Sequence, residues 1–111
     1  MISNDRKAIL ITYPYKDIIK EAISLASSAG YHIEKIVSQR HITRSKYGIG
    51  SGKAEEVKEL VRQLNVEVII FDEVIKPTQQ YNLATLCQVE IIDRERLILE
   101  IFEQRASSAE S

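Results

Sequence analysis

Runs of apolar residues alternate along the chain with segments in which apolar residues recur at helical spacing. The continuous run AILI at 8–11 is typical of a strand buried on both faces. From Asp17 onward, apolar residues at positions 19, 22, 23 and 26 share one helix face, and Gly30 supplies the end of that helix. The next strand is predicted over 32–39, where Glu34 and Lys35 indicate an edge or partly exposed position.

The second half of the chain repeats this alternation. Apolar residues at 57, 60, 61 and 64 form an i, i+3, i+4, i+7 stripe, which predicts a helix. The β-branched run VEVIIF at 66–71 predicts a central strand. Pro77 suits the first turn of a further helix, the run 89–92 predicts a fourth strand, and Asp93 has the chemistry of an N-cap for a last helix.

Alternation of strand and helix predicts an α/β fold in three layers, with a four-stranded, mainly parallel sheet and helices on both faces. By analogy with doubly wound folds, we expect the strand order 2-1-3-4. The segments 13–16, 40–53, 72–76 and 93–94 would then gather at the carboxyl ends of the strands, which is where ligands bind in such sheets. We assign residues 1–106 to this domain and 107–111 to the start of a linker.

Composition narrows the class of protein. The 111 residues suffice for one compact domain, and 44% apolar and 28% charged residues are ordinary for a soluble globular protein. Cys87 is the single cysteine, so a disulfide framework and a cysteine metal cluster are excluded. His32 and His41 have no partner at metal-ligand spacing, and we expect no metal site. No membrane-length apolar run or signal peptide is present, and we expect a cytoplasmic protein.

The loop at 40–53 concentrates glycine and positive charge. It holds three of the four glycines, and between Glu34 and Glu55 the chain has five basic residues and no acidic one. A flexible cationic loop that leads into a helix favours anions. Its spacing matches neither the P-loop G-x-x-x-x-G-K-[ST] nor the dinucleotide fingerprint G-x-G-x-x-G. An anion site and a solvated turn therefore both stay open.

Asp72, Asp93 and Arg94 are expected on the same edge of the sheet as this loop. A carboxylate at a strand end can coordinate a metal or a ribose hydroxyl, but N-capping and turn formation are commoner reasons for its presence. The tyrosines of this edge, Tyr47 among them, suit stacking on bases and equally suit packing over loop backbone. No Ser-His-Asp or Cys-His arrangement is visible, so we expect no catalysis by this chain.

Three ordered motifs between positions 47 and 106 resemble those of HflX-type GTPases. The segment IGSGKAEEV at 49–57 resembles the family's IGSGK-x-EEL, and FDEVIKPTQQYNL at 71–83 resembles FD-x-x-L-[ST]-P-x-Q-x-x-NLE. The longest, VEIIDRERLILEIFEQRA at 89–106, is similar to V-x-VIDR-x-x-LIL-x-IF-x-x-RA. The first forty or so residues match only in general character.

This resemblance implies an amino-terminal domain that precedes a helical linker and a Ras-like GTPase domain. GTP and Mg²⁺ would belong to that absent domain, so we expect no cofactor and no GTP hydrolysis in this chain. The family associates with the large ribosomal subunit, where the amino-terminal domain contacts ribosomal RNA and helps to split stalled or inactive ribosomes. ATP binding is also attributed to some members. We therefore expect a part of a longer GTPase, with a short stand-alone relative as the alternative.

The first functional hypothesis is a ribosome- and RNA-binding module whose partners are the large subunit, the linker and the GTPase domain. Its phosphate-binding residues would be Arg40, His41, Arg44, Lys46, Tyr47, Gly48, Gly50, Ser51, Gly52 and Lys53. Gly48 stands where the family has a bulkier residue, which we expect to loosen the loop. Two alternatives stay open: an adenine-nucleotide-binding regulatory domain that uses Asp72, Asp93 and Arg94, and a structural module that only packs on the GTPase domain.

Overall fold

The computed structural model describes residues 6–42 and 45–110 and contains one four-stranded sheet. The elements are β1 (Arg6–Thr12), α1 (Lys16–Ser28), β2 (Tyr31–Ser38), α2 (Ser51–Leu64), β3 (Val68–Phe71), α3 (Pro77–Cys87), β4 (Glu90–Ile92) and α4 (Arg94–Glu110). Neighbouring strands are parallel, and their order is β2-β1-β3-β4. The predicted fold class and strand order are both confirmed.

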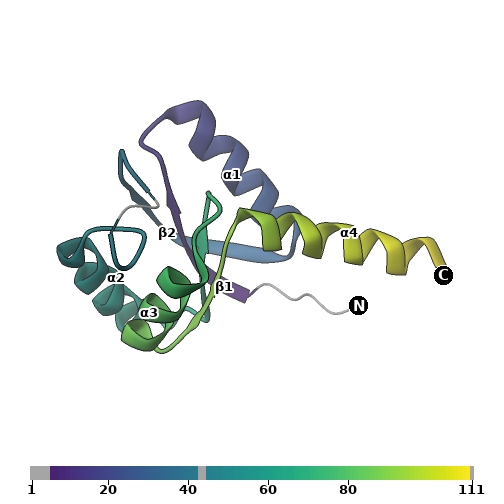
Figure 1. The fold of residues 1–111 in the computed structure, drawn as a ribbon. Helices are drawn as coiled ribbons and strands as arrows, with labels where there is room; N and C mark the ends of the chain where they lie inside the picture. The colour runs from purple at the N-terminus through teal and green to yellow at the C-terminus, as the bar shows by residue number, and fades with distance from the viewer. Residues whose placement is uncertain (1–5, 43–44, 111) are drawn as a thin grey trace.

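Helices cover both faces of the sheet, with α1 and α4 on one side and α2 and α3 on the other (Figure 1). The alternation of side chains along β1 explains why both layers are needed. Ala8 and Leu10 belong to the apolar cluster on the α1 side, while Ile9 and Ile11 belong to the cluster with Val57 of α2. All four β1 residues are fully buried, and each large side chain among them contributes about 1.5–3 kcal/mol of burial free energy.

The outer strand β2 is irregular at its middle. Ala8 pairs with Ile33 and Ile9 pairs with Lys35, so Glu34 is an extra residue in the ladder. Because Ile36 pairs with Leu10, the bulge leaves Ile33 and Ile36 on the same side of the sheet although three positions separate them. The prediction of an edge strand at this position is confirmed, and the charged pair at 34–35 coincides with the irregularity.

The helix ends follow the residues expected from the sequence. Pro77 is the first residue of α3, and Gly30 adopts φ +92° just after α1. Asp93 caps α4, because its Oδ1 accepts the backbone N–H of Arg96 at 3.0 Å. Beyond this cap α4 extends to Glu110 and projects from the rest of the domain (Figure 1), so the backbone shows no break at the expected linker boundary of 106/107.

The buried thiol of Cys87 gives a test of the packing between the sheet and α3. Cys87 is 6% exposed, and burial raises its pKa from 9.0 to about 11. Folding therefore favours the neutral thiol, a contribution that is fully present below pH 9.0 and is lost as the pH rises toward about 11. We expect thiol labelling of the native chain to be slow at neutral pH and to accelerate in denaturant. Native labelling as fast as that of the denatured chain would contradict this packing.

Candidate nucleic-acid interface

A buried carboxylate joins three elements at the carboxyl edge of the sheet. Asp72, directly after β3, is 5% exposed, and its Oδ2 accepts a hydrogen bond from Thr12 Oγ1 at 2.8 Å. Arg94 Nη1 lies 3.4 Å from Asp72 Oδ1. Burial raises the pKa of Asp72, and the Thr12 hydroxyl and the Arg94 charge offset part of that rise. Both carboxylate oxygens are thus engaged within the protein.

The neighbouring acids are also committed to internal contacts. Besides capping α4, Asp93 accepts the backbone N–H of Ile75 at 3.4 Å through Oδ2. The Tyr13 hydroxyl donates to Glu73 at 2.6 Å, and burial together with this bond raises the pKa of Tyr13 to about 12. The structure therefore brings together the acids and bases expected at this edge, and they tie the strand ends to one another.

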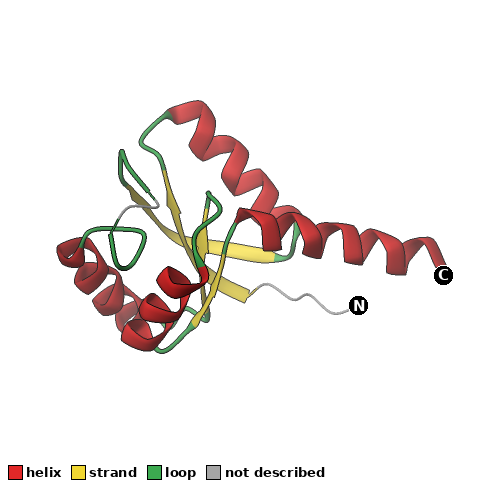
Figure 2. Cartoon of the chain, in the orientation of Figure 1, coloured by secondary structure: helices red, strands yellow, loops and turns green. Residues whose placement is uncertain are grey.

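The described part of the loop that follows β2 (green in Figure 2) contacts α3 through Ser45 and Lys46. Gln79 Nε2 donates to the carbonyl of Ser45 at 2.9 Å, and Asn82 Nδ2 donates to that of Lys46 at 3.1 Å. Ile49 is fully buried, and its carbonyl accepts the Ser45 hydroxyl at 2.5 Å. The sequence motif at 71–83 includes Gln79 and Asn82, but we predicted no contact for either side chain. Their separation by three residues, which puts both amides on one face of a helix, is the signal that could have found them.

The glycines of the loop differ in their surroundings. Gly48 is buried with φ +79°, and a Cβ atom there would lie 3.2 Å from Phe71 Cε1. It is thus closely packed, contrary to the expectation that it loosens the loop. Gly50 and Gly52 are exposed, and a Cβ at either position would meet nothing within 4 Å. Their backbones are therefore open to a partner from outside.

The basic side chains of this loop carry charge that the domain does not neutralise. Arg40, His41 and Lys46 are exposed and Lys53 is half-buried, and none of them forms an ion pair with a described carboxylate. Among the other described cations, Arg6, Arg62, Arg94 and Arg96 are paired with acids, whereas Arg105 and the lysines outside the loop form no ion pair with a described carboxylate. Arg44, also predicted to bind phosphate, lies outside the described residues.

The start of α2 continues the basic loop. Gly50 is the N-cap residue, with no side-chain cap hydrogen bond and no acidic residue in the first turn. The first intrahelical bond runs from Ala54 N to the Gly50 carbonyl at 2.8 Å. The N–H groups of Ser51 and Gly52 precede that bond, at exposed positions next to Lys53. This end of the helix adds a partial positive charge to that of the side chains.

A narrow groove separates the loop from α3. It has a volume of about 190 Å³ and is lined by Lys46, Tyr47, Tyr81, Asn82, Thr85 and Leu86. Lys46 Nζ lies 5.6 Å from the centroid of the Tyr47 ring, close enough for a cation–π contact. The Tyr81 side chain belongs to α3 and is 71% exposed.

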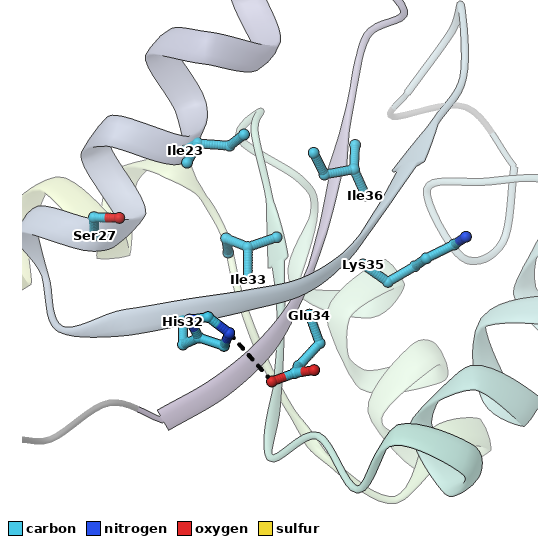
Figure 3. A pocket seen from close by; sticks show the side chains of 7 residues that line it. All are labelled: Ile23, Ser27, His32, Ile33, Glu34, Lys35 and Ile36. Carbon is cyan, nitrogen blue, oxygen red and sulfur yellow. Dashed lines mark ion pairs between the residues drawn. The ribbon is translucent and has the colours of Figure 1, made fainter.

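A larger hollow of about 490 Å³ lies between α1 and β2 (Figure 3). Ile33 and Ile36 point toward Ile23 of α1, while His32 and Glu34 form an ion pair of 3.4 Å on the other side of the strand (Figure 3). This hollow follows the outer edge of the sheet and contains none of the predicted site residues. The aliphatic side chains around it carry no chemistry beyond apolar contact.

Within 6–42 and 45–110, no group of three or more His, Cys, Asp and Glu residues is placed to hold a metal ion. In that same part of the chain, no helix combines the length and the apolar character needed to cross a membrane.

Comparisons with known proteins place this geometry in a family. A model of the family described as "GTP-binding GTPase N-terminal" matches residues 16–103. The GTPase HflX of Thermococcus kodakarensis is 40% identical over the whole chain, which covers 24% of that protein. The GTPase HflX of Escherichia coli is 42% identical over 83% of the chain, which covers 22% of its length. The chain thus spans about a quarter of the curated relatives it matches.

Solved structures give the same result. The GTP-binding protein of Sulfolobus solfataricus in complex with GDP is 26% identical, with a TM-score of 0.70, over 87% of this chain and 30% of that one. The sheet order and these matches define the class as the amino-terminal α/β domain of a GTP-binding protein. The chain belongs to the family of N-terminal domains of HflX-type GTPases.

The different surroundings of Gly48 and Gly52 predict that alanine at the two positions has opposite effects on stability. Gly48→Ala places a side chain at φ +79° against Phe71, and we expect a loss of about 1–3 kcal/mol in the free energy of unfolding. Gly52→Ala, the matched control, adds a methyl group in open space within a helix, and we expect a gain of up to about 1 kcal/mol. Urea unfolding of both variants measures the difference. Equal effects would show that the loop is not packed as described.

Proposed function

We propose that this chain is the RNA-contacting module of a longer GTP-binding protein and that its loop at 40–53 binds the phosphate backbone of ribosomal RNA in the large subunit. One observation carries the proposal. Arg40 and Lys46 are exposed and Lys53, in the first turn of α2, is half-buried, and none of the three has a described acidic partner. The chain has no acidic residue between Glu34 and Glu55 to offset this charge, and α3 holds the loop carbonyls of Ser45 and Lys46. Membership of the HflX-type family supports the choice of RNA as the anion.

Backbone phosphates suit this surface for physical reasons. Lysine and arginine replace condensed counterions at each phosphate, which makes the binding depend on salt. The open backbones at Gly50 and Gly52 allow a phosphate oxygen to approach the N–H groups at the start of α2. Contacts of this kind set the position of a protein on RNA without reading its sequence. Gly48 would affect the same site indirectly, because its buried position and positive φ set the backbone conformation of the loop.

GTP hydrolysis is proposed for the rest of the longer protein and not for this chain. The relatives are named GTPases, and the chain spans about a quarter of their length. An adenine nucleotide at Asp72, Asp93 and Arg94 is not proposed, because both oxygens of each carboxylate already accept hydrogen bonds from protein donors. Their arrangement favours a structural role at the strand ends.

We also propose that α4 packs against the linker or GTPase domain of the longer protein. Leu99 is 47% exposed and Phe102 is 63% exposed, on the part of α4 that leads away from the sheet. Large apolar side chains that stay in water each forgo about 1.5–3 kcal/mol of burial. A partner surface over this helix would recover that free energy.

The proposed phosphate contacts predict a specific effect of charge reversal. Lys46→Glu combined with Lys53→Glu should weaken binding of the 111-residue chain to large ribosomal subunits by at least tenfold at low salt. The slope of log affinity against log salt should become shallower by about 1.5, because each phosphate that a basic side chain neutralises contributes about 0.7–0.9 to it. Sedimentation of labelled chain with subunits over a salt series measures both quantities.

A matched control separates local contacts from net charge. Lys20→Glu combined with Arg62→Glu changes the net charge by the same amount at exposed positions on α1 and in the last turn of α2. We expect this variant to keep most of its affinity. If both variants weakened binding equally, general attraction would explain the data, and the assignment to the loop would fail.

A further inference from the structure

We propose that the groove between the loop and α3 takes an unstacked nucleobase of single-stranded RNA, with the ring of Tyr81 as its stacking platform. The inference rests on the proposed RNA-binding function and names the form of RNA that the same surface selects. Tyr81 is 71% exposed and lines the groove opposite the loop residues Lys46 and Tyr47. Aromatic side chains beside a cationic backbone track are the usual means of holding single strands.

The size of the groove favours one flat group. Its volume of about 190 Å³ is below the roughly 300–1,000 Å³ of pockets that enclose a whole small ligand. Its lining combines apolar area from Tyr81 and Leu86 with the polar side chains of Asn82 and Thr85. A nucleobase has both an apolar face and a polar edge, which matches this lining.

The two walls of the groove are fixed relative to each other. Asn82 belongs to the α3 wall and donates to the carbonyl of Lys46 in the loop wall at 3.1 Å. One helical turn away from Asn82, Gln79 donates to the carbonyl of Ser45 at 2.9 Å. A groove held open by such bonds loses little conformational freedom when it is filled, so more of the stacking free energy appears as affinity.

The positive charge of Lys46 beside the groove favours a nucleic acid as the occupant. Lys46 lies at the groove with its Nζ 5.6 Å from the Tyr47 ring and has no described carboxylate partner. The sequence contains no acidic residue between Glu34 and Glu55, so no acid of the loop itself offsets the charge of Lys46. A base that enters the groove brings its own phosphate toward this wall. Bases inside a duplex are already stacked on each other and cannot enter.

The chain contains no tryptophan, so Tyr81→Trp creates a single fluorescent reporter in the groove. The probes are a short oligoadenylate, an abasic oligonucleotide with the same number of phosphates, and a duplex of equal phosphate count. We expect oligoadenylate to quench the tryptophan, and the abasic and duplex probes to leave its emission unchanged. Equal quenching by the abasic probe would overturn the stacking proposal.

The affinities of variants without the tryptophan reporter complete the test. Tyr81→Ala should weaken oligoadenylate binding by about 5- to 100-fold without changing the salt slope, while Tyr81→Phe keeps the wild-type affinity. The Tyr81 side chain is exposed, so we expect unchanged thermal stability in both variants. If Tyr81→Ala bound as well as wild type while Lys46→Glu with Lys53→Glu did not bind, stacking would be wrong and the phosphate contacts would stand. If wild type bound neither oligonucleotides nor ribosomal subunits, both proposals would fall.

Discussion

The packing of Gly48 and Ile49 between the sheet and α3 is the constraint on which the proposed interface depends. Gly48 takes φ +79° against Phe71, and Ile49 is fully buried beside it. Just before these two residues, Ser45 and Lys46 lie against α3, where side-chain amides donate to their carbonyls. The following residues must then start α2 at the surface. The burial of Gly48 and Ile49 thus places the basic loop and the start of α2 next to each other at the surface.

The carboxyl edge of the sheet has two parts with opposite electrostatics. At the ends of β1, β3 and β4, Asp72 is buried. Its carboxylate accepts a hydrogen bond from Thr12 and pairs with Arg94, so it interacts with protein groups and not with an external ligand. Beyond β2, the cations of the loop lack such partners among the described residues. In an open parallel sheet, ligands usually bind at the carboxyl edge where the strand order reverses, which here lies between β1 and β3. Here the inner part stabilises the fold, and the outer part is left for an anion.

The sequence predicted the regular part of the structure because local patterns determine it. The N-cap at Asp93 and the role of Pro77 followed from spacing and residue type, whereas the strand order came from analogy with doubly wound folds. The contacts that shape the site could not be derived in this way. Thr12 meets Asp72 across 60 positions, and Asn82 meets Lys46 across 36, so only the folded chain reveals these pairs. The close approach of Gly48 to Phe71 and Ile75 likewise joins residues that lie far apart along the chain.

A structure of the longer protein bound to the large ribosomal subunit would test the account most directly. The account predicts that Arg40, Lys46 and Lys53 lie within ion-pair distance of RNA phosphate oxygens, at the loop held by α3. It also predicts that the α2 start faces the RNA backbone. If the loop at 40–53 instead faced solvent or the protein's own GTPase domain while the complex formed, the claim that this surface binds RNA would be contradicted.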